Sequence, residues 1–371
     1  MRADPVLGPL DRVLDGAAVA PVLGAERCVP RHVRYRPGRE LRVLYELDTG
    51  LAHLTVLRPD RTRRLWSRVR ASGLLERAPD GARPVPELGG VLQRYPVDVR
   101  LPGLLDVARS DEIVGSSAGG RMKLVRYKPG RRALLRGRGV YAKVRADDAG
   151  ARTVALAKAL IRRGVATPTP LRHDAALRMT VHAEAPGTRL ADLQGPELEA
   201  WMEPVAEALA RLHATRIEGL DPVHDEPADL RAAAATAAAL RPERAAEIGR
   251  LAGALVAGLQ DRHGTATLHG SFHQDQVLVG DDGVFLLDLD SAAAGDPLVD
   301  VGHFAAYLSA AGESTARERF LAAYGTTAPV HEAAALLRWS SLPFRTLEPG
   351  WPEAVDRRLD LAAARLRGSS G

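Results

Sequence analysis

The chain has 371 residues, of which 46% are apolar and 26% charged, and its formal net charge is +5. This composition is typical of a core-forming globular protein with one large domain or several smaller ones, and it excludes a disordered or fibrous chain. No apolar run approaches the ~18 residues that would cross a bilayer, and the amino terminus has no signal pattern, so we expect a cytoplasmic protein that does not bind a membrane. The one cysteine, Cys28, excludes a disulfide framework and a cysteine zinc cage.

The basic residues are distributed unevenly between lysine and arginine. Only four of the 51 are lysines, all between Lys123 and Lys158, and the chain contains no asparagine. A compact ammonium is not equivalent to a planar guanidinium, so a lysine kept in an arginine-rich chain is a candidate for function. Aromatic residues make up only 4% of the chain and no basic stripe accompanies them, which argues against nucleic-acid binding.

A repeat organises the first half of the chain. The segment 34–39 (RYRPGR) returns at 126–131 as RYKPGR, and each copy is followed in the same order by a β-rich stretch, a helical stretch, a Pro-x-Pro and a Pro-Gly. Three landmarks in one order favour two related α+β units, at roughly 25–108 and 115–190, over a chance match. Each RYxPGR predicts a strand, a Pro-Gly turn and a returning strand.

The second copy and the rest of the chain predict strands first and then mostly helices. Asp147 and Asp148 are candidate caps for a helix over 149–163. We expect strands at 132–136, 140–144, 179–183 and 267–270, a hairpin formed by 276–279 and 284–287, and helices at 149–163, 197–214, 227–239, 245–260, 298–310, 314–323, 330–340 and 352–367.

The densest group of polar residues in an apolar setting is the segment 269–276 (HGSFHQDQ), followed by Asp288 and Asp290 at the end of an apolar strand. Two carboxylates placed together at a strand end repel each other, and a hard divalent cation would offset that repulsion. Hydrogen bonds from neighbouring loop amides would also offset it, and the residues alone leave both explanations open.

Three stretches of the chain carry a family resemblance. The core HGSFHQDQVLV with FLLDLDSAAAGDPLVD resembles that of the aminoglycoside phosphotransferase and choline kinase-like family, whose pattern is His-Gly-Asp-x-His-x-x-Asn, Ile-Asp-Phe/Trp and Gly-Asp-Pro. LARLHA at 209–214 and HAEAPGTRL at 182–190 resemble the helix before the core and the linker. The resemblance covers about 115–345 and implies an α+β, bilobal protein-kinase-like fold with ATP between two lobes.

Carried over by position, the resemblance implies roles for three residues. Lys143 would hold the α- and β-phosphates of ATP, Asp288 would bind Mg²⁺, and Gln276 would be the amide ligand of a second metal position. Asp290, two residues after Asp288, is a further candidate metal ligand. Glutamine in place of asparagine is also found in maltokinase-like relatives. The alternative for Lys143 is that it is simply an edge-strand residue.

The chain departs from the family pattern at two places. Ser271 stands where the family has its catalytic Asp, and an ordinary alcohol cannot accept the proton of the attacking hydroxyl. His273 or Asp275 is a candidate replacement, although Asp275 also fits a solvated loop position. The helix 149–163 has no acidic residue to orient Lys143, which leaves Asp147 or Asp148 as the nearest candidates.

Other chemistries fit less well. Ser271 lies between two histidines, but the G-x-S-x-G of a serine hydrolase elbow is absent. His269 and His273 could join Asp288 in a zinc site, but His269 is better explained as a residue that packs and holds the loop. Asp300 is expected to be the N-cap of the following helix, and Asp296 to organise the loop before it.

The resulting organisation has three lobes and a tail. We predict an N-terminal cap over 1–110 that is a degenerate duplicate of the N-lobe, an N-lobe over 111–190, a helical C-lobe over 191–367 and a flexible tail over 368–371. The predicted function is ATP- and Mg²⁺-dependent transfer of phosphate to a hydroxyl of a small molecule or of a peptide Ser/Thr. The alternative is a pseudokinase that binds a peptide or a protein partner, with the N-terminal lobe as a candidate partner surface.

Overall fold

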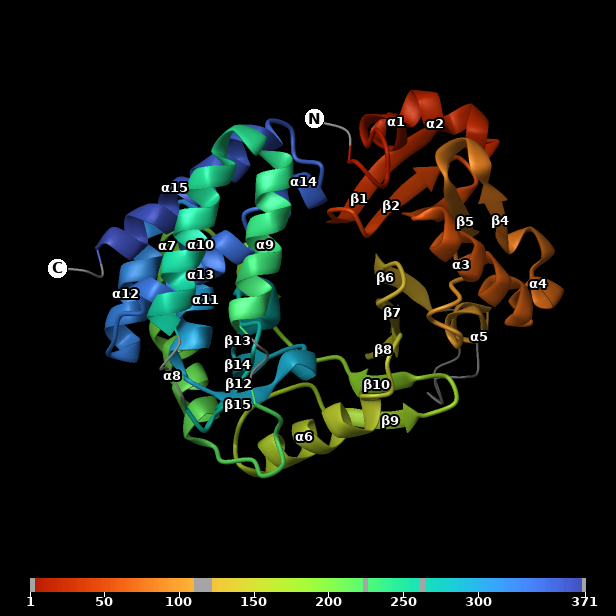
Figure 1. Cartoon of the computed structure of the whole chain (residues 1–371). Coiled ribbons are helices and arrows are strands. Elements are labelled where there is room, and N and C mark those ends of the chain that lie inside the picture. The colour runs from red at the N-terminus through yellow and green to blue at the C-terminus, as the bar shows by residue number, and fades with distance from the viewer. Residues whose placement is uncertain (1–3, 110–121, 223–225, 260–263, 369–371) are drawn as a thin grey trace. The chain divides into compact units, whose positions relative to one another are not determined.

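The computed structural model describes residues 4–109, 122–222, 226–259 and 264–368 (Figure 1). The chain forms two compact units. The first combines Met1–Ala151, Leu171–His182 and Leu342–Trp351, and the second combines Arg152–Pro170, Ala183–Ser341 and Pro352–Gly371. The predicted boundary at 110/111 and the last three residues of the predicted tail lie outside the described residues. The predicted boundary at 190/191 stays a prediction.

The first unit contains a five-stranded antiparallel sheet in the order β1-β2-β3-β5-β4. Helix α2 packs against β1, and α3 packs against β3 and β5. The β1–β2 hairpin turns at Gly38, whose positive φ of 65° is the backbone conformation that a Pro-Gly turn predicts. The elements are α1 (Asp11–Leu14), α2 (Gly16–Leu23), β1 (Cys28–Arg36), β2 (Glu40–Leu47), β3 (Gly50–Leu57), α3 (Pro59–Ala71), α4 (Leu74–Arg77), β4 (Ala82–Val85), β5 (Gly90–Arg94) and α5 (Leu104–Arg109).

A second five-stranded sheet has the order β6-β7-β8-β10-β9. The succession along the chain is the same in both sheets, because three strands are followed by a helical segment and then by two more strands. This common strand order is the arrangement that the predicted repeat requires. The elements are β6 (Lys123–Lys128), β7 (Arg132–Gly137), β8 (Val140–Arg145), α6 (Gly150–Arg162), β9 (Pro170–Asp174) and β10 (Met179–Ala183).

The two sheets of the first unit share one buried apolar cluster. It joins Leu44 of β2 and Leu104 and Val107 of α5 to Tyr127 and Ala133 of the second sheet. Burial of apolar surface is the main favourable term in folding, so a shared cluster makes the two sheets one cooperative unit. The sequence repeat alone suggested two separate lobes in this region.

The second unit is mainly helical, and helices α9, α10 and α13 pack against one another. Its core includes a row of three rings, in which Phe304 lies 5.0 Å from Phe272 and 4.4 Å from Phe320 between centroids. The elements are β11 (Thr188–Arg189), α7 (Gly195–Ala200), α8 (Met202–Ala214), α9 (Glu226–Leu240), α10 (Ala245–Leu259), β12 (Ala266–Leu268), β13 (Val277–Gly280), β14 (Gly283–Leu286), β15 (Ala293–Gly295), α11 (Leu298–Ala311), α12 (Ser314–Tyr324), α13 (Pro329–Arg338) and α15 (Trp351–Arg367).

Two helices differ from the prediction. The helix expected over 197–214 is broken at Trp201 into α7 and α8, because Pro204 has no N–H to donate and is tolerated only in the first turn of a helix. The short helix α14 (Leu342–Arg345), which belongs to the first unit, was not predicted. No helix in the described part of the chain is long and apolar enough to cross a membrane.

Candidate functional site

The candidate site is built on the loop that follows β12 and on the β13–β14 hairpin. After β12 the loop runs through His269 to a short 3-10 turn at Gln274–Gln276, and β13 starts directly after it. The hairpin then returns the chain to Leu287, whose N–H donates to the carbonyl oxygen of Gln276 at 2.8 Å. This backbone bond brings the loop and the Asp-x-Asp segment of the sequence side by side.

Asp300 holds this loop from α11. Its carboxylate accepts hydrogen bonds from the backbone N–H of His269 at 2.6 Å, from that of Gly270 at 2.9 Å and from the His213 ring at 3.1 Å. The side chain is fully buried. Burial by itself would raise the pKa of Asp300, but the hydrogen bond and charge of His213, with further charge from His269 and His303, hold that pKa below its ordinary value.

The prediction that Asp300 caps the next helix is therefore wrong. Helix α11 begins at Leu298, so Asp300 already lies inside its first turn. The capping hydrogen bond comes instead from Asp296, which accepts from the N–H of Leu298 at 2.9 Å. Pro297, which precedes the helix, also has helical φ and ψ. The predicted start of this helix at residue 298 is confirmed.

His269 holds the loop, as predicted. Its Nε2 donates to the carbonyl oxygen of Leu287 at 2.7 Å, and its ring packs against Phe272. Among the described residues, no three or more His, Cys, Asp and Glu side chains are grouped as a metal site.

Gly270 has a positive φ of 75°, and a Cβ at this position would overlap the backbone carbonyl of Ser291. We expect Gly270→Ala to destabilise the protein by more than about 1 kcal/mol, since strain and overlap act together. The matched control is Gly283→Ala in the nearby hairpin turn, where φ is also positive but no atom lies within 4 Å. Thermal melting should show the larger loss of Tm for Gly270→Ala, and equal losses would contradict the overlap.

Three of the predicted site residues lie together. The Gln276 side-chain nitrogen is 3.4 Å from Nε2 of His273 and 3.4 Å from Oδ2 of Asp288. Asp288 has left-handed backbone angles, φ 60° and ψ 55°, which are uncommon for a residue other than glycine and are concentrated at functional sites. His273 is stacked on Tyr307, with ring centroids 4.7 Å apart, and meets the edge of Trp339. These rings fix the imidazole beside Gln276.

The remaining residues of the loop are half-buried. Ser271 lies between Gly270 and the buried Phe272, and Asp290 lies in a 3-10 turn two residues after Asp288. The Asp275 side chain is 25% exposed, and its carboxylate is 3.9 Å from the guanidinium of Arg189. Asp275 is therefore not simply a solvated loop residue.

Lys143 lies in the first unit, on β8. That strand is the middle one of its sheet, so the alternative that Lys143 is an edge-strand residue is wrong. The predicted orienting residue Asp147 is bound by Arg145, at 2.8 Å, and also accepts from the N–H of Ala149 at 3.3 Å. Helix α6 has no acidic residue, as the sequence shows.

The strand register also shows which cap residue corresponds to Lys143. Lys143 of β8 pairs with Leu134 of β7, which is the third residue after the second RYxPGR. In the cap the third residue after RYxPGR is Arg42 of β2, and it pairs with Thr55 of β3. Thr55 therefore stands where the second sheet carries Lys143, and the cap lacks this lysine.

Sequence reasoning missed how the loop is supported. His213 connects Asp300 to the Tyr324 hydroxyl, which lies 2.7 Å from His213 Nδ1. The available signal was LARLHA, which resembled a family helix but had no role attached to its histidine. Tyr307 and Trp339 had no signal in the sequence, because only the packing of α11 on α13 brings them to His273.

Comparison with known proteins gives a consistent result. Residues 112–365 match the family model described as the phosphotransferase enzyme family. A choline/ethanolamine kinase family protein from Mesorhizobium loti shares 18% identity over 71% of this chain and 92% of its own, with a TM-score of 0.51. Wild-type aminoglycoside 2'-phosphotransferase-IIIa, solved as a GDP complex, shares 13% identity over 71% of this chain and 98% of its own, with a TM-score of 0.50. No curated protein sequence matches the chain significantly. These structural matches confirm the predicted protein-kinase-like fold.

Proposed function

Because the chain belongs to the phosphotransferase enzyme family, we propose that it transfers the γ-phosphate of ATP, with Mg²⁺, to a hydroxyl group. The observation that carries this proposal is the group formed by Gln276, Asp288 and His273 on a loop held by a buried carboxylate. The solved GDP complex of a structural relative supports a nucleotide ligand. The names of both relatives support a small-molecule acceptor, with a peptide Ser/Thr as the other acceptor class.

The residues of the site fit a magnesium ion. Mg²⁺ prefers oxygen ligands and is commonly held by one or two carboxylates together with substrate phosphates. Asp288 would supply the carboxylate, and Gln276, whose side-chain amide lies 3.4 Å from it, would supply its amide oxygen. Asp290 is the further carboxylate of the segment. When bound, the ion would neutralise charge on the transferring phosphate, and Lys143 would hold the α- and β-phosphates.

Ser271 in place of the catalytic Asp is expected to lower the rate of phosphoryl transfer. Phosphoryl transfer depends mostly on positioning and charge neutralisation, so a site without a proton acceptor retains slow catalysis. The two candidate replacements for the catalytic Asp lie in the same loop as Ser271. His273 is held by its aromatic neighbours, and Asp275 lies beside Arg189. We assign them as candidate proton acceptors in the absence of the usual Asp.

The second candidate function is that of a pseudokinase scaffold. It is favoured by two observations, namely Ser271 in the loop and the lack of an acidic residue in α6. A scaffold would bind a peptide or a protein partner and position it for another enzyme, with the N-terminal sheet as a further surface. Nucleotide binding is compatible with both functions, whereas turnover is expected only from the enzyme.

Nucleotide binding is tested by thermal melting of the full-length protein with and without MgATP. We expect Tm to rise, since a ligand at 100 times its Kd adds about 2.7 kcal/mol. Lys143→Ala and Asp288→Asn should abolish the rise. Lys158→Ala, which removes an exposed lysine from α6, is the matched control and should keep it. A wild-type protein that does not respond to MgATP, MnATP or MgGTP would contradict the proposal.

A further inference from the structure

The turn between β6 and β7 is held by a buried carboxylate. Oδ2 of Asp98 accepts hydrogen bonds from the Tyr127 hydroxyl at 2.9 Å and from the Gly130 N–H at 2.6 Å. The other oxygen, Oδ1, accepts from the N–H of Arg100 at 2.9 Å, which fixes the segment that carries the carboxylate. We call Asp98, Tyr127 and Gly130 the turn clamp.

The first copy of the repeat contains the same arrangement. Oδ2 of Asp4 accepts from the Tyr35 hydroxyl at 2.7 Å and from the Gly38 N–H at 2.8 Å, and Oδ1 accepts from the N–H groups of Val6 and Leu7. We call this group the first-copy clamp. Each clamp uses the tyrosine and the glycine that both RYxPGR segments share. The two clamps therefore form a matched pair within one protein.

The turn clamp is also tied to the N-terminal sheet through β3 and β5. The Tyr127 hydroxyl lies 3.0 Å from Nδ1 of His53, and Nε2 of His53 lies 3.1 Å from the side-chain nitrogen of Gln93. Gln93 Oε1 accepts from the N–H of Val99, next to Asp98. Burial lowers the pKa of His53 to about 4, so the neutral imidazole donates from Nδ1 and accepts at Nε2. A buried network in which these groups are paired favours one geometry.

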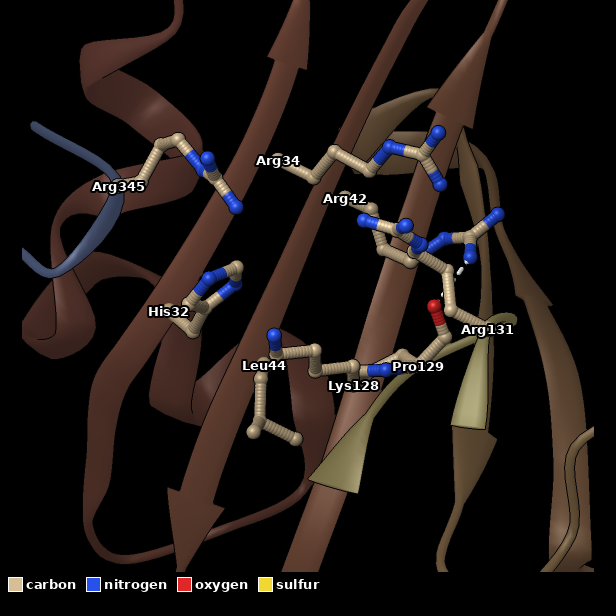
Figure 2. A pocket seen from close by; sticks show the side chains of 8 residues that line it. All are labelled: His32, Arg34, Arg42, Leu44, Lys128, Pro129, Arg131 and Arg345. Carbon is tan, nitrogen blue, oxygen red and sulfur yellow. Dashed lines mark hydrogen bonds between the residues drawn. The ribbon is translucent and has the colours of Figure 1, made fainter. Parts of the chain in front are cut away.

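Arg42 of β2 reaches the same turn. It donates to the carbonyl oxygen of Pro129 at 2.5 Å, a bond drawn as a dashed line in Figure 2, and to Thr55 Oγ1 at 3.1 Å. It also pairs with Glu40 at 2.7 Å. Figure 2 looks into the pocket that Arg42 and Lys128 line together. The N-terminal sheet thus holds the turn through side chains of β2 as well as β3.

The turn is bonded directly to the strand that carries Lys143. The carbonyl oxygen of Arg131, at the end of the turn, accepts from the N–H of Ala146 at 2.9 Å, just after β8 ends. From there the β7–β8 ladder runs to the pair of Leu134 and Lys143. Because hydrogen-bonded neighbours open and shift as a unit, a loosened turn would loosen the backbone of Lys143. In the first copy the equivalent ladder leads to Thr55, which carries no charge.

We propose that the turn clamp positions Lys143 for the nucleotide, so that the N-terminal sheet contributes to the affinity for MgATP. This proposal rests on the proposed function, in which Lys143 holds the α- and β-phosphates. Asp98 acts through the turn and is a positioning residue. An ammonium on a backbone that is held in advance loses less conformational freedom when it meets a phosphate.

Titration calorimetry of the full-length protein with MgATP tests the proposal. We expect Asp98→Asn to weaken binding about tenfold, because the ligand must then order the loosened turn and Lys143. The matched control is Asp4→Asn, which breaks the first-copy clamp and should keep the wild-type affinity. Both variants should lose a similar amount of Tm, since each removes a buried acceptor from a tyrosine and a glycine.

The comparison of affinity with Tm separates positioning from stability. A merely structural role of Asp98 would lower Tm and leave the Kd of the folded protein unchanged. Wild-type affinity in Asp98→Asn, or an equal loss of affinity in Asp4→Asn, would overturn the proposal.

A milder pair of variants covers the case in which an aspartate variant does not fold. Tyr127→Phe removes only the hydroxyl that meets Asp98 and His53, and Tyr35→Phe removes only the hydroxyl that meets Asp4. We expect Tyr127→Phe to weaken MgATP binding about threefold or more, since one buried hydrogen bond of the clamp is lost. Tyr35→Phe should bind as the wild type does, and equal effects of the two variants would count against the turn clamp.

Hydrogen exchange without nucleotide distinguishes this proposal from the proposed function. In Asp98→Asn the amides of residues 130–146 should exchange faster than in the wild type, and in Asp4→Asn they should keep their wild-type rates. If the wild type does not bind MgATP, the proposed function fails, whereas the exchange rates still decide whether the clamp holds the strand of Lys143. Unchanged exchange in Asp98→Asn would overturn the positioning role whether or not the nucleotide binds.

Discussion

The Ser271→Asp variant is expected to release ADP from MgATP about 10²–10⁴ times faster than the wild-type protein, because general-base assistance contributes this much to proton transfer. Ser271 lies on the loop that Asp300 holds through the two preceding backbone N–H groups, so the new carboxylate would enter a site whose backbone is already placed. ADP release should be followed with water alone and with a panel of amino alcohols, sugars and Ser/Thr peptides. The acceptor that raises the rate of the variant would identify the substrate class.

Two controls distinguish restored catalysis from other changes. Ser271→Ala should leave the rate near that of the wild type, since an alcohol does not act as the base. The double variant Ser271→Asp/Asp288→Asn should lose the gain, because the proposed metal ligand is removed. If Ser271→Asp binds MgATP but shows no gain in ADP release, the pseudokinase function is supported instead.

Asp300→Ala is expected to destabilise the protein by about 3–5 kcal/mol. The substitution leaves the N–H groups of His269 and Gly270 and the His213 ring without their common acceptor in a fully buried place. Chemical denaturation of the variant should give this loss, and any residual folded protein should also bind MgATP less well because its loop has lost its anchor.

The neighbouring carboxylate provides the comparison. Asp296→Ala removes the capping bond to Leu298 and the 3.6 Å contact of its carboxylate with His331 Nε2, and should cost only about 1 kcal/mol. The two variants should also differ in acid. Because the folded-state pKa of Asp300 is lowered, its contribution to stability is complete above the unfolded value of about 3.9 and is lost as pH falls through the folded value. Wild type should therefore lose stability below about pH 4 more steeply than Asp300→Ala, and similar behaviour of all three proteins would contradict this role.

Much of the fold was predictable from local patterns. Turn residues and apolar periodicity determine the Pro-Gly turns, the β13–β14 hairpin and most helices of the second unit. These signals lie in residues that are close together in the sequence. The repeat of landmarks predicted two related units, and both sheets have the same strand order. Where the helix prediction failed, at Trp201, a proline in the first turn of α8 decided where the helix starts.

The sequence predicted which residues form the candidate site, but not which residues hold them in place. Lys143, Gln276 and Asp288 could be identified because the residue types that bind phosphate and magnesium occur in a known order. The buried acceptor role of Asp300 could not be identified, because its three donors come from α8 and from the loop after β12, far from it in the sequence. The same limit applies to the aromatic rings around His273.

The lysines show most clearly which features the sequence determined and which the tertiary structure decided. The amino-acid sequence by itself determined that the four lysines lie between residues 123 and 158 and that Gln276 stands where asparagine is usual. Only the tertiary structure decided that Lys143 lies on a central strand and that Lys128 joins five other basic side chains in a pocket of the first unit. The physical reason is that composition and periodicity act between neighbours in the chain, whereas burial and electrostatic fields depend on which distant segments pack together.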